Sequence, residues 1–240
     1  MLVHVADLNK TIAIDFRETA PAAATQEMFF DANGNVVLDE TYRFSHKSSA
    51  IPGSVAGLAH IVEKYGTMSL SDVLQPAIRL ARDGIKVTYD LAADLERSQR
   101  LKNNPASLKK FYKPDGSSYR VGEIFKQPDL AWTLSEIAEN GVDAFYRGSV
   151  AEKIVADMKA HNGLITMEDL SNYKATWREP LHQKIYGYDG WTSPPSTQGY
   201  LTLSTLKGFE MINNKDDYLH TLIAVSYTHL RAHETKANLV

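Results

Sequence analysis

A segment near the start of the chain, TIAIDFRETAPAAAT at residues 11–25, places an arginine at the end of a strand-like pattern. Apolar side chains recur at every second position, at Ile12, Ile14 and Phe16, and this period of two predicts a β-strand. Arg17 follows on the opposite face, so we expect it at the strand end among apolar neighbours. The proline and alanines after it are typical of a turn.

An arginine at the end of a strand is well suited to binding an anion. Its planar guanidinium donates two parallel hydrogen bonds to a carboxylate and keeps its charge at every working pH. Arg17 is therefore a candidate ligand for the α-carboxylate of an amino acid. The alternative is that Arg17 pairs internally with Asp15 or Glu18 and only completes the strand.

The composition limits the class of protein. The 240 residues are 43% hydrophobic, enough for one substantial core or two small ones. A net charge of −3, without a basic stripe, argues against a nucleic-acid partner. No apolar run approaches the roughly 20 residues that span a bilayer. The absence of cysteine excludes disulfides, thiolate metal sites and a cysteine nucleophile, and it leaves the compartment open.

Hydrophobic periodicity and capping residues predict a mostly helical chain after the first strand. Helices are expected at 53–66, 69–84, 90–101, 128–141, 144–160, 166–170 and 200–212. A turn is expected at Asn33-Gly34, and two strands between Gln183 and Trp191, separated near Gly187. No repeat or long linker interrupts this order. The pattern predicts an α+β fold in which a helical layer packs on a sheet with some strands missing.

The loop Ser193-Pro194-Pro195-Ser196-Thr197-Gln198-Gly199 has two open interpretations. Paired prolines stiffen a loop, and a rigid loop can shape a pocket. The same residues can simply turn a strand into a helix.

Several ordered blocks resemble the large subunit of the γ-glutamyltranspeptidase family. The resemblance rests on DFRETAPAAAT, SHKSSAIPGSVAGLAHIVEKYG, LSDVLQPAIRLARDG, QPDLAWTLSEIAENGVDAFYRG, GLITMEDLSNY and SPPSTQGY. It covers residues 1–224, so this part is interpreted as a partial large subunit. TQGY replaces the SSGG-like ending that is more usual in the family, which leaves the role of this loop open.

The resemblance implies an incomplete N-terminal-nucleophile hydrolase sandwich of αββα type. In that family a precursor cleaves itself and exposes a threonine at the start of a small subunit, and this threonine attacks the γ-glutamyl carbonyl. No threonine here has that context, and the chain contains no other recognisable catalytic set. We therefore expect no catalytic residue in this fragment, substrate binding by Arg17, and no cofactor.

The resemblance also implies the partners and the location. They are a γ-glutamyl substrate such as glutathione and a small subunit from the same precursor, in a periplasmic or secreted protein. The first residues, MLVHV, are typical of the middle of a strand, so the natural start is expected further upstream. Two alternatives stay open: a β-lactam side-chain acylase of the same superfamily, and a structural or binding module without chemistry.

Residues 225–240 depart from the family pattern. Back-translation of residues 225–235 resembles a transposon-based sequencing adapter, so this tail is interpreted as non-native. His229 and His233 are four residues apart, a spacing that can place two imidazoles on one helical face. Without a third ligand at a known distance the signal is weak, and we assign no metal.

Overall fold

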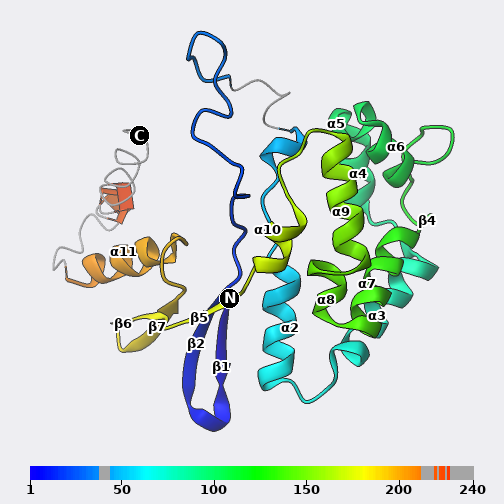
Figure 1. The fold of residues 1–240 in the computed structure, drawn as a ribbon. Helices are drawn as coiled ribbons and strands as arrows, with labels where there is room; N and C mark the ends of the chain where they lie inside the picture. Colours follow the sequence, from blue (N-terminus) through cyan, green and yellow to red (C-terminus); the bar gives the residue numbers. More distant parts are fainter. Residues whose placement is uncertain (38–43, 212–218, 221, 225, 228–240) are drawn as a thin grey trace. The chain divides into compact units, whose positions relative to one another are not determined.

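The computed structural model describes residues 1–37, 44–211, 219–220, 222–224 and 226–227 (Figure 1). The chain divides into two compact units. Unit 1 comprises Met1–Thr19, Pro52–His60 and Lys174–Val240, and unit 2 comprises Ala20–Ile51 and Ile61–Tyr173. Among the described residues, no helix combines the length and the apolar character that a bilayer crossing requires.

A three-stranded antiparallel sheet in the order β1-β2-β5 forms the first part of unit 1. Strand β1 (Leu2–Val5) leads through the short 3-10 helix η1 (Ala6–Leu8) into β2 (Lys10–Asp15), and β5 is Thr176–Arg178. The β1–β2 ribbon is dark blue in Figure 1. The predicted first strand is confirmed, and β2 lies in the centre of the sheet with a partner on each side.

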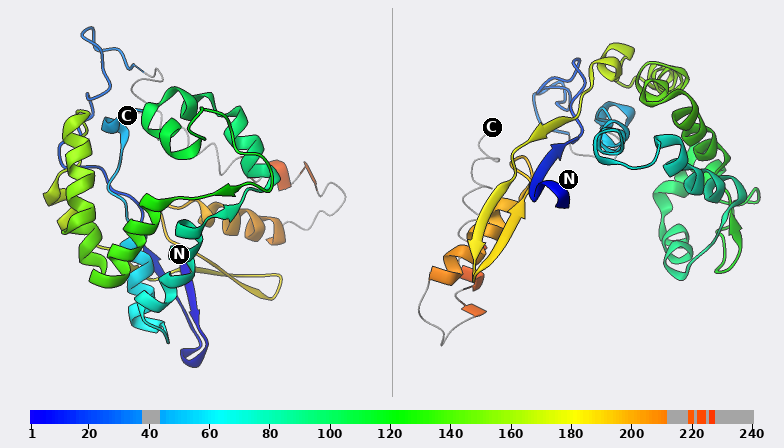
Figure 2. Two further views of the ribbon diagram at one scale, coloured as in Figure 1. Left: turned by 90° about the vertical axis from the view of Figure 1, so that its right-hand side faces the viewer. Right: turned by 90° about the horizontal axis from the view of Figure 1, so that it is seen from below.

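A hairpin and a helix complete the regular structure of unit 1. Strands β6 (Leu181–Ile185) and β7 (Tyr188–Thr192) pair antiparallel, and helix α11 (Gly199–Met211) lies beside them (Figure 2). The turn residues Tyr186 and Gly187 both have positive φ, 49° and 83°, which is the backbone geometry of a type I′ hairpin turn. The hairpin predicted around Gly187 is therefore confirmed.

Unit 2 is mainly helical. Helix α2 (Ser54–Tyr65) begins in unit 1 and ends in unit 2. The other elements, in chain order, are η2 (His46–Ser48), α3 (Leu70–Asp83), β3 (Ile85–Lys86), α4 (Tyr89–Arg97), α5 (Gln99–Asn103), α6 (Pro105–Phe111), β4 (Ile124–Phe125), α7 (Pro128–Asn140), α8 (Val142–Tyr146), α9 (Ser149–Ala160) and α10 (Met167–Asn172). Strands β3 and β4 pair with each other.

Local capping chemistry sets the ends of several helices where the sequence predicts them. The Ser69 hydroxyl accepts the N–H of Asp72 at the start of α3, as expected for an N-cap. Thr166 and Asp169 form a reciprocal capping box at the start of α10. Pro128 is the first residue of α7, a position where its missing N–H is not needed.

Two predicted helices are each divided in the structure. The helix expected at 90–101 is α4 followed by α5, with the break at Ser98, whose ψ of 83° is not helical. The helix expected at 144–160 is α8 followed by α9, because the chain leaves helical geometry at Arg147 and Gly148. The short helix α6 was not predicted. Its Asn104 cap and Pro105 at the first position are the local signals for it.

The α+β class is confirmed. The described strands form one three-stranded and two two-stranded sheets, which matches the partial sheet content expected. The predicted boundary at Val225, both tail histidines and the predicted helix end at Ile212 lie outside the described residues.

Candidate functional site

The end of β2 borders a cavity of about 240 Å³ within unit 1. Residues 13–18 form one wall at the strand end, and Met1 and Ser54 contribute to the rest. Ser193, Pro194 and Thr197 line it from the loop that connects β7 to α11. Arg17 and the Pro-rich loop, two separate candidates in the sequence, therefore lie in one site.

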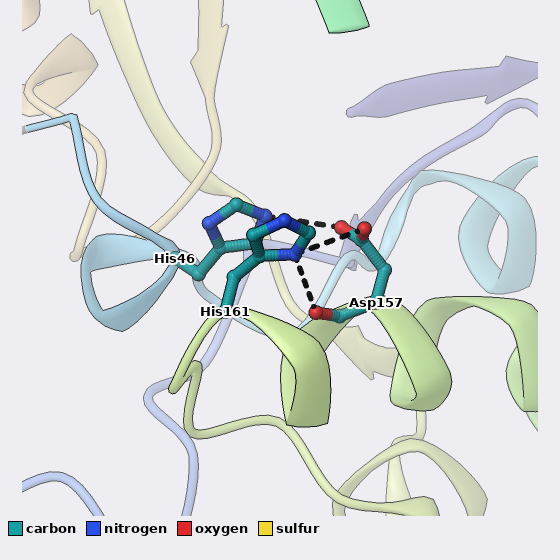
Figure 3. Close-up of side chains that lie close together, drawn as sticks. All are labelled: His46, Asp157 and His161. Carbon is teal, nitrogen blue, oxygen red and sulfur yellow. Dashed lines mark hydrogen bonds and ion pairs between the residues drawn. The ribbon is translucent and has the colours of Figure 1, made fainter.

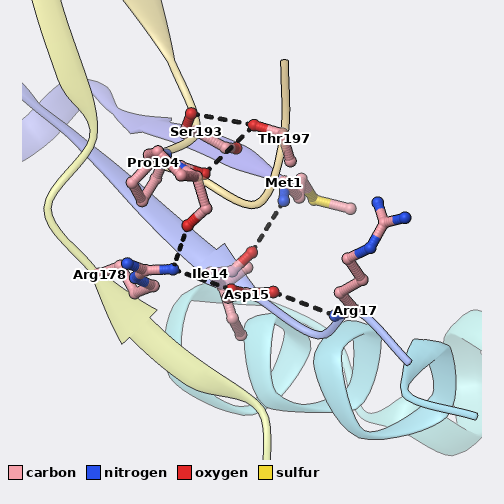
Figure 4. A network of polar contacts seen from close by, with 9 residues as sticks. Met1, Ile14, Asp15, Arg17, Arg178, Ser193, Pro194 and Thr197 are labelled. Carbon is pink, nitrogen blue, oxygen red and sulfur yellow. Dashed lines mark hydrogen bonds and ion pairs between the residues drawn. The ribbon is translucent and has the colours of Figure 1, made fainter. Parts of the chain in front are cut away.

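Asp15 links the strand end to the rest of the site (Figure 4). Its Oδ1 accepts the backbone N–H of Arg17 at 3.1 Å, and its Oδ2 accepts a hydrogen bond from Nη1 of Arg178 at 3.1 Å. The same Nη1 donates to the Pro195 carbonyl at 2.6 Å. Asp15 and Arg178 thus connect the backbone that carries Arg17 to the Pro-rich loop.

The Pro-rich loop is also held by its own hydroxyl group. Oγ1 of Thr197 lies 3.0 Å from the carbonyl of Ser193 and 3.2 Å from that of Pro194 (Figure 4). These contacts close the loop on itself. They support the interpretation in which it shapes a pocket, because the closed loop forms one wall of the cavity.

The Arg17 side chain extends from the strand end away from the Asp15–Arg178 contact (Figure 4). Its Nη2 is 3.6 Å from Oε1 of Glu18, and the two side chains are 56% and 55% exposed. An exposed pair at this distance contributes about 0–1 kcal/mol, so an incoming carboxylate can exchange with Glu18 at little cost. The cavity places Arg17 beside Ile14, Phe16 and Pro194, but the side chain is not enclosed by them. The strand ends two residues earlier, at Asp15, and the guanidinium reaches the surface.

Packing against α2 fixes the residue before Arg17. A Cβ at Gly57 would overlap the ring of Phe16, so this ring lies directly on the helix backbone. Ala13 and Ile14, each only 1% exposed, anchor the preceding strand. The backbone that leads to Arg17 is thereby held from both sides.

The hydroxyls around the cavity do not form a catalytic set. No histidine is among the described residues that line it, and Thr197 is engaged with two backbone carbonyls. A hydroxyl nucleophile needs an adjacent base to remove its proton. Arg17 is the side chain of this lining that is suited to pairing with an anion.

Sequence reasoning did not identify the contact of Asp15 with Arg178 or the place of Ser54 in the cavity lining. Arg178 and Asp15 are 163 residues apart, and only the pairing of β5 with β2 brings them together. The sequence does show Asp15 directly before Phe16-Arg17, which indicates a charged strand end. It does not indicate that Arg178 is the partner of Asp15.

The fold resembles several solved enzymes. A Helicobacter pylori γ-glutamyltranspeptidase superposes with a TM-score of 0.89 at 34% identity, covering 96% of this chain and 68% of that one. A cephalosporin acylase from Bacillus halodurans superposes with a TM-score of 0.78 at 28% identity, covering 92% of this chain and 42% of that one. The fold is therefore that of part of an N-terminal-nucleophile hydrolase.

The family model described as "Gamma-glutamyltranspeptidase" matches residues 1–236. A glutathione hydrolase proenzyme from Escherichia coli is 43% identical over 217 residues, covering 88% of this chain and 37% of that protein. The chain belongs to the γ-glutamyltranspeptidase family. It spans well under half the length of the curated relatives it matches.

Proposed function

We propose that this chain is part of the large subunit of a γ-glutamyl transferase/hydrolase that cleaves γ-glutamyl amides such as glutathione. The observation that carries the proposal is that Arg17 and the Pro-rich loop line one cavity at the end of β2. In the proposed role, the Arg17 guanidinium binds the α-carboxylate of the γ-glutamyl donor. Family membership supports the reaction class, and the relatives are named glutathione hydrolase proenzymes.

Binding at the α-carboxylate would orient the donor. A guanidinium that grips one end of the glutamyl group fixes where the γ-carbonyl, several bonds away, meets a nucleophile. Such positioning lowers the barrier by removing freedom that the reactants would otherwise lose in the transition state. The Asp15–Arg178 contact supports this role because it holds the backbone at Arg17.

The nucleophile is proposed to be a threonine of a small subunit derived from the same precursor. Its hydroxyl would form a γ-glutamyl ester and its free amine would accept the proton, after which water or an amine takes the acyl group. The 240-residue chain alone is expected to be inactive.

A side-chain acylase is the second candidate, and the similarity to the cephalosporin acylase supports it. The two candidates differ in what Arg17 would meet. A γ-glutamyl donor always carries an α-carboxylate, whereas an acylase needs one only if its acyl group has an equivalent charge. A structural module without chemistry is the third possibility, and the small-subunit coding sequence decides it: a threonine start supports both enzymes.

The test uses the complete two-subunit protein with Arg17→Ala and Arg17→Lys. Loss of hydrogen bonds to a charged group costs about 1.5–3 kcal/mol, so kcat/KM for a γ-glutamyl donor should fall by about 10- to 100-fold in Arg17→Ala. Lysine should restore little, because it lacks the planar fork. Arg97→Ala is the matched control, since Arg97 pairs with Asp94 at 2.9 Å and is 76% exposed in unit 2.

Unchanged donor kinetics in Arg17→Ala would remove Arg17 from the binding site. An equal loss with a donor analogue that lacks the α-carboxylate would do the same, because the guanidinium would then have no group to recognise. A preference for β-lactam side-chain donors over γ-glutamyl donors would favour the acylase.

A further inference from the structure

Two histidines and an aspartate meet at the C-terminal end of α9, in unit 2. Among the described residues, His46, Asp157 and His161 form the one group of at least three such side chains whose ligand atoms all lie within 4.8 Å of one another. Nε2 of His46 is 3.0 Å from Oδ2 of Asp157, and Nδ1 of His161 is 3.2 Å from Oδ1 (Figure 3). Each carboxylate oxygen therefore faces one imidazole nitrogen.

We propose that these three side chains bind one divalent transition-metal ion, with Zn²⁺ as the reference ion. Two imidazoles and a carboxylate are a donor set that suits Zn²⁺ and its neighbours in the first transition row. Three protein ligands leave one tetrahedral position for water. This site is separate from the Arg17 cavity, since all three residues belong to unit 2, and it does not depend on the proposed enzymatic activity.

The distances are close to those that a metal requires. Ligand bonds of about 2.0–2.2 Å in a tetrahedron separate neighbouring donor atoms by about 3.3 Å. The two nitrogen–oxygen distances, 3.0 and 3.2 Å to the two oxygens of Asp157, are near this value, and the ligand atoms of all three residues lie within 4.8 Å of one another. An ion would thus enter with small movements of side chains that are 34%, 59% and 53% exposed for His46, Asp157 and His161.

The two rings are held side by side. The imidazoles of His46 and His161 are stacked, with centroids 4.4 Å apart and planes 10° apart. Their two nitrogens therefore face the carboxylate from the same side, as Figure 3 shows. A cation between them and the carboxylate would use both rings without rotating either one away.

The end of α9 places His161 and makes room for His46. Asp157 and His161 are four residues apart and share one face of the helix end. Asn162 has a positive φ of 55°, and the N–H of Gly163 donates to the carbonyl of Met158 at 2.8 Å, which is the Schellman ending of a helix. A Cβ at Gly163 would lie 3.0 Å from Cβ of His46, so glycine lets the η2 segment approach.

The helix also favours a cation at this place. The C-terminal end of a helix carries partial negative charge from its unpaired carbonyls. The Asp157 carbonyl accepts from Nδ1 of His161 at 2.9 Å in the absence of metal. Metal binding would displace the proton of this nitrogen, because a ligand must offer its lone pair.

The experiment measures Zn²⁺ binding to the 240-residue chain by isothermal titration calorimetry, with the protein prepared without a polyhistidine tag. All proteins carry His229→Gln and His233→Gln, so that the two histidines of the tail cannot bind the ion. The expected result is one Zn²⁺ per chain. His46→Gln, Asp157→Asn and His161→Gln should each weaken binding by at least about 10-fold, because loss of a ligand should cost no less than loss of a group that only supports a ligand.

His182→Gln is the matched control. Nε2 of His182 is 2.7 Å from Oδ1 of Asp189. The His182 ring stacks on Trp191 and not on a second histidine, so this pair offers a metal ion one imidazole and one carboxylate. Its substitution should leave Zn²⁺ binding unchanged. Circular dichroism in EDTA checks that every variant is folded, and the visible spectrum of added Co²⁺ reports the ligand set independently.

Three results would overturn the proposal. They are no saturable binding by the folded chain, equal binding by the three ligand variants, and a loss in His182→Gln as large as that in His161→Gln. If one of the three ligand variants fails to fold, the other two are used. The proposal then fails if their Co²⁺ spectra are the same as that of the parent chain.

Discussion

Asp169 in unit 2 and Asp15 in unit 1 both join distant parts of the chain, but they differ in burial. Asp169 is 8% exposed and accepts the N–H of Ala22, which is 147 residues away, at 2.9 Å. The Asp15 side chain is 37% exposed and pairs with Arg178 across 163 residues. The comparison teaches that similar contacts have different consequences: the buried carboxylate should control stability, and the half-exposed one should control the geometry of the cavity.

The largest expected effect tests the buried member. Asp169→Ala removes the acceptor for the N–H of Ala22 and for the N–H and hydroxyl of Thr166. Hydrogen bonds to a charged group are worth about 1.5–3 kcal/mol, and the donors belong to exposed residues that water can reach, so the free energy of unfolding should fall by about 2 kcal/mol. Urea unfolding followed by circular dichroism measures it. A loss below 1 kcal/mol would mean that water replaces these contacts and that burial does not distinguish the two carboxylates.

The dependence of the free energy of unfolding on acidic pH should also report on Asp169. Burial acts to raise the pKa of Asp169, but the hydrogen bonds from Ala22 and Thr166 outweigh it and hold the pKa below its ordinary value. A lowered folded-state pKa stabilises the protein above the unfolded value of about 3.9 and the effect is lost as the pH falls through the folded-state pKa. As the pH is lowered below about 4, the free energy of unfolding should therefore fall less in Asp169→Asn than in the wild type. Urea unfolding at each pH measures this. Parallel losses would contradict this.

Asp15→Asn tests the half-exposed member in the complete two-subunit protein. Stability should change by less than about 1 kcal/mol, because the ion pair is partly solvated. KM for the proposed γ-glutamyl donor should rise several-fold with kcat nearly unchanged, since the Asp15 carboxylate holds the backbone N–H of Arg17. If Asp15→Asn weakens donor binding only as much as it lowers the free energy of unfolding, Asp15 has a structural role alone.

The smallest effect is expected for an exposed, local pair. Asp94 and Arg97 are one helical turn apart and 72% and 76% exposed. Asp94→Asn should change the free energy of unfolding by no more than about 0.5 kcal/mol and leave donor kinetics unchanged. A larger change would mean that the exposed fraction of Asp169, Asp15 and Asp94 does not predict the order of their effects on stability.

The sequence predicts features whose causes are local. Ser69 and Thr166 cap helices through groups three residues away, and Gly187 defines a tight turn by its own backbone freedom. The α+β class and the membership of the family were also predictable, because long motifs occur in a fixed order. The breaks at Ser98 and Gly148 were not, because helical periodicity continues across them.

The arrangement of both sites depends on contacts between distant segments. Arg17 was found from its place after a strand, but no local pattern announces that Arg178 would meet Asp15. Likewise, the spacing of Asp157 and His161 is visible on a helix, whereas the approach of His46 requires the fold around Gly163. Patterns with periods of two or four residues cannot encode contacts between segments that are far apart in the sequence.

The close packing of Phe16 on Gly57 has a practical consequence for engineering. Any side chain at position 57 must push the aromatic ring aside, and this ring is the immediate neighbour of the proposed anion ligand. A library designed to alter donor preference should therefore vary position 57 together with position 16. Substitutions at position 57 would alter recognition indirectly, by displacing a ring that itself lines the cavity.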